Sequence, residues 1–529
     1  ADGFFSDGVH PSAHGYALWS EAMIKFLIKK VEKNKMNLES SFALLIKKLD
    51  SHNEWLLIGA SGKSFPLQRG EIEFTFEREK IIFGFLNDAG FQIWRVADCQ
   101  IENEKITLDL TRNFARECEK IRLVPRISAS ELGEAVELAR LEKANQIARL
   151  IVAENRGAKL IRVSLNEENG RFAQIVFEKS DKKQIAVLAD IADAATPENL
   201  LTIAIVWLTN LENRKKPIEI VWILAEKKLY KNLRKLHALL RESWKSKIYI
   251  KEISRPSAKA QREEILEVSP ITFGNLWREK PPKISLTENT ELSETATEII
   301  KLAPEKIDVI FTKHGETMRF FGLPFARIRR FADVEKAWFG IEREKRILNE
   351  NSRAEFFGLF ENLEIYRRFD SPNKRHALFR LAPEAWLESL LRRNIKLLDG
   401  NLILSPIHNQ FRAANETIDL LALRRDGRLI VIELKIAPDR EMIFQAVDYW
   451  RKIELQRHSG NLRKAKIFGD LEISNEPTLV FLAAPTLSFH RDFAFLAKTV
   501  SPEIEIYKFG LNENWRENLK VMKVSKVEK

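Results

Sequence analysis

Short apolar runs, several of them alternating with polar residues, recur between residues 53 and 128 and predict a series of β-strands. The strand candidates are WLLIGAS, EIEFTFE, KIIFGFL, FQIWRVAD, KITLDLT and KIRLVPR. Turn-forming residues separate these runs, as they do in antiparallel sheets. We therefore expect a β-rich domain over residues 35–130, folded as a small barrel or sandwich.

Helix and strand patterns alternate in two later parts of the chain, residues 131–253 and 381–509. Each part reads as a helix, three strands, a helix, a strand, a helix and a strand, with apolar residues at helical spacing in the helices. The residues themselves hardly match, so the repeat is one of pattern. Two explanations stay open. Either the two parts share one fold, or they show the alternation that is common in α/β chains.

Three further segments flank or separate these parts. Residues 1–34 read as a loop and then a helix, the polar residues 255–304 as a linker, and residues 305–380 as a small β-rich unit. The expected fold class is multidomain α+β and α/β. Its parts are expected at residues 1–34, 35–130, 131–254, 255–304, 305–380 and 381–529.

Composition narrows the class of protein. The chain has 529 residues, 45% of them apolar and 30% charged, and it contains no run of 18 apolar residues that could span a membrane. It shows no signal peptide, and its two cysteines give neither a disulfide framework nor a zinc-finger spacing, so we expect a cytoplasmic protein. The net charge of +11 suits a polyanionic partner such as DNA without proving one.

The segment IDLLALRRDGRLIVIELK, residues 418–435, combines an apolar hairpin pattern with charged residues. Asp426-Gly427 predicts a tight turn between two strands. Asp419 begins the first strand, and Glu433 and Lys435 end the second on one face, so the three side chains should meet. Two buried carboxylates need a cation, and their hard oxygen atoms suit Mg²⁺ or Mn²⁺. The alternative is a surface hairpin with a Glu433–Lys435 salt bridge.

Neighbouring helices supply further candidates for this site. Glu388 lies on the preceding helix, WLESLL. Gln445 and Tyr449 lie four residues apart on the following helix, QAVDYW, and so share one helix face. A metal that activates water, together with a fixed cation, is what phosphodiester hydrolysis requires.

Taken together, these residues resemble the PD-(D/E)XK nuclease superfamily in its RecB-like branch. The motifs that match in order are Glu388, Asp419, Glu433-Leu434-Lys435 and Gln445…Tyr449, within residues 381–509. One departure is Ile418, where the family pattern has proline. The resemblance implies a restriction-endonuclease-like α-β-β-β-α-β core.

The resemblance also implies a role for each residue. Asp419 and Glu433 would hold the metal, Lys435 would assist catalysis, and Glu388 would support the metal or the water. The two helix residues would position the site or the DNA strand; these are Gln445 and Tyr449.

The middle part, residues 131–254, lacks this chemistry. Gln174 falls near the Asp position and Asp190 near the end of the third strand, but no E-x-K motif is present. We therefore expect a degenerate copy of the nuclease fold without a metal site. Its basic helix either binds DNA or presents a solvated face; the basic residues are Lys227, Lys228, Lys231, Arg234, Lys235 and Arg241.

Two tryptophans flank the predicted site. Trp386 and Trp450 either stack on DNA bases or pack the helices that carry them.

The N-terminal segment SDGVHPSAHGYALWSEAM resembles the final block of SGNH (GDSL-type) hydrolases. In that family a D-x-x-H motif supplies the Asp and His of a Ser-His-Asp triad, and here those would be Asp7 and His10. The nucleophilic serine of the family lies far upstream of this block. We therefore expect residues 1–34 to be a hydrolase remnant with an idle pair. Whether residue 1 is the true start, and whether a hydrolase body lies upstream, stays open.

The predicted function is a Mg²⁺- or Mn²⁺-dependent deoxyribonuclease. One alternative is a DNA-binding or scaffold protein whose nuclease-like fold is catalytically silent. A second is a truncated SGNH esterase or lipase fused to the nuclease-like region. Endo- against exonuclease action, DNA structure preference, pathway and oligomeric state stay open.

Overall fold

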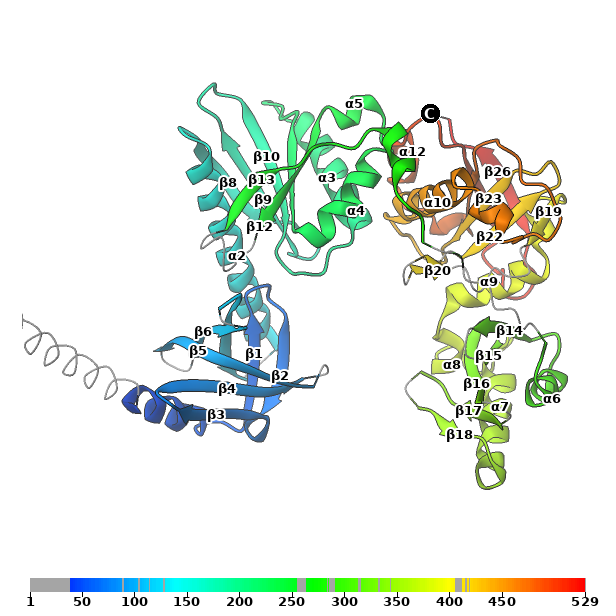
Figure 1. Cartoon of the computed structure of the whole chain (residues 1–529), viewed down its shortest axis with the longest axis horizontal. Helices are drawn as coiled ribbons and strands as arrows, with labels where there is room; N and C mark the ends of the chain where they lie inside the picture. The colour runs from blue at the N-terminus through cyan, green and yellow to red at the C-terminus, as the bar shows by residue number, and fades with distance from the viewer. Residues whose placement is uncertain are drawn as a thin grey trace, which may run out of the picture. The chain divides into compact units, whose positions relative to one another are not determined.

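The strands in the described part of the chain form five β-sheets, and helices accompany them (Figure 1). The multidomain, mixed α+β class expected from the sequence is confirmed, whereas the specific restriction-endonuclease-like core stays a prediction. This computed structural model describes residues 39–87, 90–102, 105–113, 115–126, 129–254, 263–282, 284, 291–312, 315–331, 334–342, 344–404, 412–413, 416–417 and 419–528. The chain divides into two compact units, and the second comprises residues 196–210, 231–249 and 269–529.

The first sheet of the first unit has seven strands in the order β2-β1-β7-β6-β5-β4-β3, with antiparallel neighbours. Buried aromatic residues such as Trp55 and Phe83 form its core with Leu45 and Leu49 from the helical residues 39–49. The elements are β1 (Glu54–Gly59), β2 (Ser64–Gln68), η1 (Arg69–Glu71), β3 (Ile72–Glu77), β4 (Lys80–Asn87), β5 (Gly90–Glu102), β6 (Lys105–Arg112) and β7 (Glu117–Pro125).

A second, mixed sheet has the strand order β13-β12-β11-β10-β9-β8. β8, β9 and β10 run antiparallel in turn, and β11 is parallel to β10. Ile147 and Ile151 of the long helix α2 pack against Ile175 and Val187 of the sheet. The elements are α2 (Ala129–Glu154), β8 (Lys159–Leu165), β9 (Phe172–Glu178), β10 (Gln184–Asp190), β11 (Val221–Ala225), β12 (Ile248–Ser254) and β13 (Glu264–Glu267). Three helices lie between these strands in sequence: α3 (Pro197–Glu212), α4 (Lys227–His237) and α5 (Glu242–Lys245).

The second unit contains a five-stranded antiparallel meander in the order β14-β15-β16-β17-β18. Beneath it, Arg367 is buried and donates to the backbone carbonyl groups of Phe321 and Ala382, so it fixes the segment that leads into α9. The elements are α6 (Glu294–Leu302), β14 (Ile307–Thr312), β15 (Gly315–Phe320), β16 (Leu323–Phe331), β17 (Val334–Phe339), β18 (Arg346–Ile347), η3 (Glu350–Ser352), α7 (Arg353–Tyr366) and α8 (Ala377–Arg380).

The last large sheet has the order β19-β22-β23-β24-β25-β26, which repeats the strand order of the mixed sheet in the first unit. Its first three strands run antiparallel in turn and β24 is parallel to β23, again as in that sheet. The repeated element order expected from the sequence is therefore present in both sheets. The strands are β19 (Leu402–Leu404), β22 (Leu420–Arg424), β23 (Leu429–Leu434), β24 (Leu479–Pro485), β25 (Ile506–Leu511) and β26 (Val521–Lys526), and a separate pair is β20 (Arg412–Ala413) with β21 (Glu416–Thr417).

Helices α9 and α10 pack against opposite faces of this sheet. Leu387 of α9 shares a core cluster with Ile430 and Ile432, whereas Ile453 of α10 shares another with Val431. Because successive residues of a strand point to opposite faces, Ile430 and Ile432 fill one side of β23 and Val431 fills the other. The helical elements here are α9 (Pro383–Arg393), η4 (Ile395–Leu397), α10 (Met442–His458), α11 (Asn461–Lys464), η6 (Thr486–Ser488) and α12 (Phe493–Thr499).

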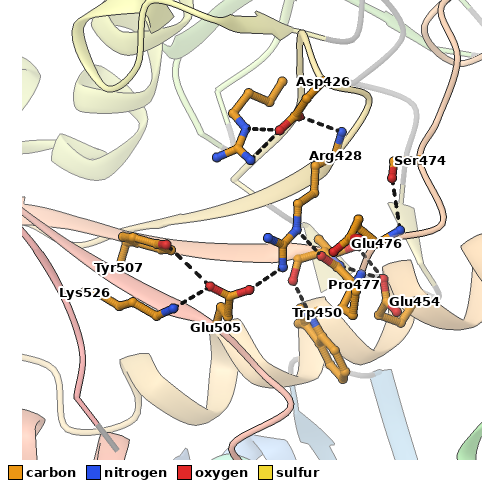
Figure 2. A network of polar contacts seen from close by, with 12 residues as sticks. Asp426, Arg428, Trp450, Glu454, Ser474, Glu476, Pro477, Glu505, Tyr507 and Lys526 are labelled. Carbon is orange, nitrogen blue, oxygen red and sulfur yellow. Dashed lines mark hydrogen bonds and ion pairs between the residues drawn. The ribbon is translucent and has the colours of Figure 1, made fainter.

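The turn between β22 and β23 is where the sequence predicts it. Gly427 has φ +84°, a conformation that favours glycine, and its N–H donates to the Arg424 carbonyl over 2.8 Å. Beyond the turn, Arg428 donates to the Pro477 carbonyl over 2.7 Å and to Glu505 over 2.6 Å (Figure 2). These contacts tie the hairpin to the neighbouring strands and fix its register.

Part of the segment that we expected to be a linker is structured. It contains β13, the 3₁₀ helix η2 (Phe273–Arg278) and α6, while residues 255–262 lie outside the described range. Phe273 and Trp277 of η2 pack against Trp450 of α10, with ring centroids 6.2 and 6.0 Å from it. This aromatic packing is a tertiary contact, which local composition does not reveal.

None of the helices that the structure describes is both long enough and apolar enough to cross a lipid bilayer.

Candidate functional site

The β22–β23 hairpin brings Asp419, Glu433 and Lys435 together. The register pairs Leu420 with Ile432, which places Asp419 beside the end of β23. There the Leu434 N–H donates to Asp419 Oδ2 over 2.8 Å. Lys435 Nζ lies 3.2 Å from Glu433 Oε1, so both side chains are on one face, as the spacing predicts.

Burial perturbs the charges of this cluster. Glu433 is 2% exposed, and both burial and the Asp419 charge raise the pKa of its carboxyl group. Burial, opposed by the hydrogen bond from Leu434, raises the pKa of Asp419 to about 7. Burial alone would lower the pKa of Lys435, but the surrounding carboxylates raise it, Glu433 most strongly. The lysine is therefore a fixed cation beside two acids that resist ionisation together.

Glu388 lies close enough to this cluster for its charge to raise the pKa of Asp419. It also has ion-pair partners of its own. Its carboxylate makes an ion pair with Arg319 of β15 at 3.3 Å and another with Arg392 at 3.4 Å. Arg319 is 5% exposed and also pairs with Asp308. Glu388 thus joins α9 to the five-stranded meander, and its predicted role at the metal stays a prediction.

Glu384, one turn before Glu388 on α9, is an acid that our sequence reasoning missed. Its charge contributes to the raised pKa of Asp419, of Glu433 and of Lys435. The signal was available in the sequence, because residues four apart on a helix share a face. The family pattern points to one helical acid, and the segment PEAWLES has two on that face.

The two predicted helix residues lie on α10. Gln445 is partly buried, and its side-chain Oε1 has no hydrogen-bond partner among the described residues. Tyr449 is also partly buried, packs against the apolar cluster on the α10 side of the sheet, and has Lys452 Nζ 5.5 Å from its ring centroid. Their roles in positioning the site or DNA stay predictions.

The two tryptophans pack the protein interior. Trp386 and Trp450 are each 1% exposed. The Trp386 ring stacks on Phe321 at 5.2 Å, and Trp450 Nε1 donates to the Thr478 carbonyl over 2.7 Å. This burial favours the packing explanation over stacking on bases.

In the middle sheet, the positions that correspond to the acids have other contacts. Asp190, at the end of β10, accepts hydrogen bonds from N–H groups of the loop that follows, including one from Ala192 N over 3.0 Å. Gln174 sits within β9, opposite Leu188. On the basic helix, three lysines are exposed, whereas Lys235 pairs with Glu279 at 2.7 Å; the exposed residues are Lys227, Lys228 and Lys231.

The donor set at the hairpin fits a hard cation in part. Glu433 Oε2 is buried and has no hydrogen-bond partner among the described residues, and it neighbours the Asp419 carboxylate. A bound cation would satisfy that oxygen and stabilise both ionised acids. Within the described ranges, however, no group of three or more His, Cys, Asp or Glu side chains is arranged to hold a metal ion. Asp7 and His10 of the predicted hydrolase remnant lie outside the described residues.

Comparison with known proteins adds little to this geometry. No family model and no curated protein matches the chain. Among solved structures, apo EndoMS matches with 12% identity and a TM-score of 0.16, covering 41% of this chain and 95% of that one. A repair endonuclease from Pyrococcus abyssi matches with 14% identity and a TM-score of 0.17, covering 41% and 96%. EndoMS in complex with double-stranded DNA matches with 13% identity and a TM-score of 0.16, covering 39% and 84%. TM-scores this low establish neither a shared fold nor a shared function.

Proposed function

We propose that the protein is a Mg²⁺- or Mn²⁺-dependent nuclease of the PD-(D/E)XK type that hydrolyses phosphodiester bonds in DNA. The observation that carries this proposal is the cluster of Asp419, Glu433 and Lys435 at one end of a hairpin. Glu433 Oε2 is buried without a hydrogen-bond partner among the described residues, and the pKa of both acids is raised. Two such acids could hold a metal that activates water, and the lysine supplies a fixed cation for the charge that develops on the phosphate.

Each residue has a definite task in this proposal. Asp419 and Glu433 would hold the cation, with Glu384 or Glu388 of α9 as a third acid. The metal would supply Lewis-acid polarisation of the phosphate and activation of water. Lys435, held beside Glu433 at 3.2 Å, would keep its ammonium group next to the scissile phosphate and offset the charge that develops there.

One observation favours the alternative of DNA binding without cleavage. The two arginine partners of Glu388 occupy its carboxylate, so the three-acid ligand set expected from the sequence is not assembled in the described residues. The esterase alternative rests on Asp7 and His10, which lie outside the described residues.

The test is cleavage of single-stranded, duplex and branched DNA in Mg²⁺, in Mn²⁺ and in chelator, with DNA binding measured in parallel. We expect Asp419→Ala and Lys435→Ala to lose at least a hundredfold in cleavage while they retain DNA binding, because these groups act mainly on the transition state. The control is Asp470→Ala, at an exposed acid remote in sequence from the hairpin. Cleavage that persists in Asp419→Ala would contradict the proposal, and binding without cleavage by the wild type would favour the alternative.

A further inference from the structure

Residues from far upstream in the chain contact the loop between Lys435 and α10. Thr196 directly precedes α3, and Asn199 lies in the first turn of that helix. The Asn199 side-chain amide donates to Glu441 Oε1, and Thr196 Oγ1 lies 3.5 Å from Glu441 Oε2. Glu441 is partly buried and directly precedes α10. All three residues belong to the second unit, so one compact body contains both sides of the contact.

A second contact joins another stretch of the middle part, residues 231–249, to the C-terminal part of the chain. Leu240 and Val500 form an antiparallel bridge. On either side of it, Arg241 N donates to the Thr499 carbonyl over 2.9 Å and Ser501 N to the Leu239 carbonyl over 2.7 Å. Two backbone hydrogen bonds therefore join the residues that follow α4 to the residues around the end of α12, within the same compact unit as the Asn199–Glu441 contact.

From Glu441, polar contacts continue to the predicted catalytic lysine. The Glu441 N–H donates to Asp439 Oδ1 over 2.7 Å. The other oxygen of that carboxylate, Oδ2, lies 3.4 Å from Lys435 Nζ, which in turn lies 3.2 Å from Glu433 Oε1. An unbroken series of hydrogen bonds and ion pairs therefore links Asn199 to the site.

We propose that Asn199 is a positioning residue: it holds Glu441 in place, so that Asp439 keeps the Lys435 ammonium group beside Glu433. This inference rests on the proposed nuclease function of the Asp419–Glu433–Lys435 site. It gives the middle part of the chain, whose sequence lacks the E-x-K motif, a task, because its helix α3 orders the loop beside the proposed site in the same chain. The segment acts through the loop and needs no contact with DNA.

The experiment compares Asn199→Ala with Asn210→Ala in the full chain. Asn210 is the same residue type on the same helix, and it is exposed. We expect Asn199→Ala to lower kcat about tenfold without changing the Kd for DNA, since a hydrogen bond to a charged group is lost and not a phosphate contact. Amide hydrogen exchange in residues 436–441 should become faster in Asn199→Ala and stay unchanged in Asn210→Ala.

A double substitution separates positioning from general stability. If Asn199 acts through Glu441, then Asn199→Ala should cause no further loss of kcat in a Glu441→Ala background. Additive losses would overturn the proposal, as would equal loop exchange in the Asn199 and Asn210 variants, or a parallel loss of DNA affinity and kcat. The exchange measurement needs no activity, so it tests the loop contact even where the wild type fails to cleave DNA. That failure would overturn the proposed nuclease function and, with it, the effect of Asn199 on kcat.

Discussion

The protonation state of the Asp419 carboxyl group links the stability of the protein to pH. Its folded-state pKa of about 7 lies above the ordinary value near 3.9, so the folded protein binds the extra proton. Without metal, its contribution to stability is therefore lost as pH rises from about 4 to 7. We expect Asp419→Asn in chelator at pH 8 to raise the Tm by about 2–4 °C. This is the shift that roughly 1 kcal/mol causes in a domain of about 150–250 residues.

The same substitution tests metal binding. Mn²⁺ should raise the Tm of the wild type, more strongly at pH 8 than at pH 6 because the acids must ionise to bind it. It should not raise the Tm of Asp419→Asn. Thermal unfolding with and without Mn²⁺ measures both effects, and Asp470→Asn, an exposed acid, serves as the control. If Mn²⁺ leaves the Tm of the wild type unchanged at both pH values, the proposed metal site is contradicted.

Two glutamates on one helix should separate a structural role from a functional one. Glu388→Gln removes one of the two acids that pair with the buried Arg319, and we expect it to lower the free energy of unfolding by about 1–3 kcal/mol. Glu384→Gln removes a charge that acts on the site and should weaken Mn²⁺ binding with little change in stability. Denaturant unfolding and calorimetric titration of Mn²⁺ measure the two quantities. If instead Glu388→Gln weakens Mn²⁺ binding and Glu384→Gln lowers the free energy of unfolding, then Glu388 is the third ligand.

At the residue scale, the local sequence pattern was enough to predict which side chains meet within one hairpin, but not across distant parts of the chain. The meeting of Asp419, Glu433 and Lys435 follows from a period of two and a tight turn, both visible in the sequence. The partner of Glu388 was not visible, because Arg319 is 69 residues away and belongs to another sheet. Long-range ion pairs of this kind depend on how sheets and helices pack, which a single sequence does not encode locally.

At the element scale, the β22–β23 turn sets the register that creates the site. A Cβ atom at Gly427 would lie 2.9 Å from the Glu472 carbonyl oxygen, and φ there is +84°. We expect Gly427→Ala to destabilise the protein by about 1–2 kcal/mol, the usual cost of a left-handed conformation for an L-residue. Gly400→Ala is the matched control, because no atom lies within 4 Å of its Cβ position. Chemical denaturation compares the two, and equal stabilities would show that the turn tolerates a side chain.

Element order was more predictable than the elements that join the parts. The helix and strand patterns indicated two similar sheets, and both sheets have the same strand order. The 3₁₀ helix η2 was missed because Trp277 packs against residues distant in sequence, including His458 of α10, on which it stacks at 4.7 Å between ring centroids. The loop contact at Glu441 was missed for the same reason, since Asn199 is 242 residues upstream.

At the scale of the whole molecule, the net charge of +11 would attract DNA over the longest distance of any interaction. Binding should weaken with salt, because each neutralised phosphate releases counterions. We expect a triple change to Gln on the basic helix α4 to weaken DNA binding and to lower the slope of log K against log salt by up to about 3, near 0.9 per lost phosphate contact. The changed residues are the exposed lysines Lys227, Lys228 and Lys231.

The control for this prediction changes net charge by the same amount elsewhere. It replaces three exposed lysines outside the helix with Gln; these are Lys80, Lys105 and Lys182. If α4 contacts the phosphate backbone, the α4 variant loses affinity and slope while the control keeps both, at every salt concentration from about 50 to 200 mM. If only the net charge matters, both variants change alike, because long-range attraction is screened equally for both. A salt slope in the α4 variant equal to that of the wild type would identify the helix as a solvated face and place the DNA contacts elsewhere on the protein.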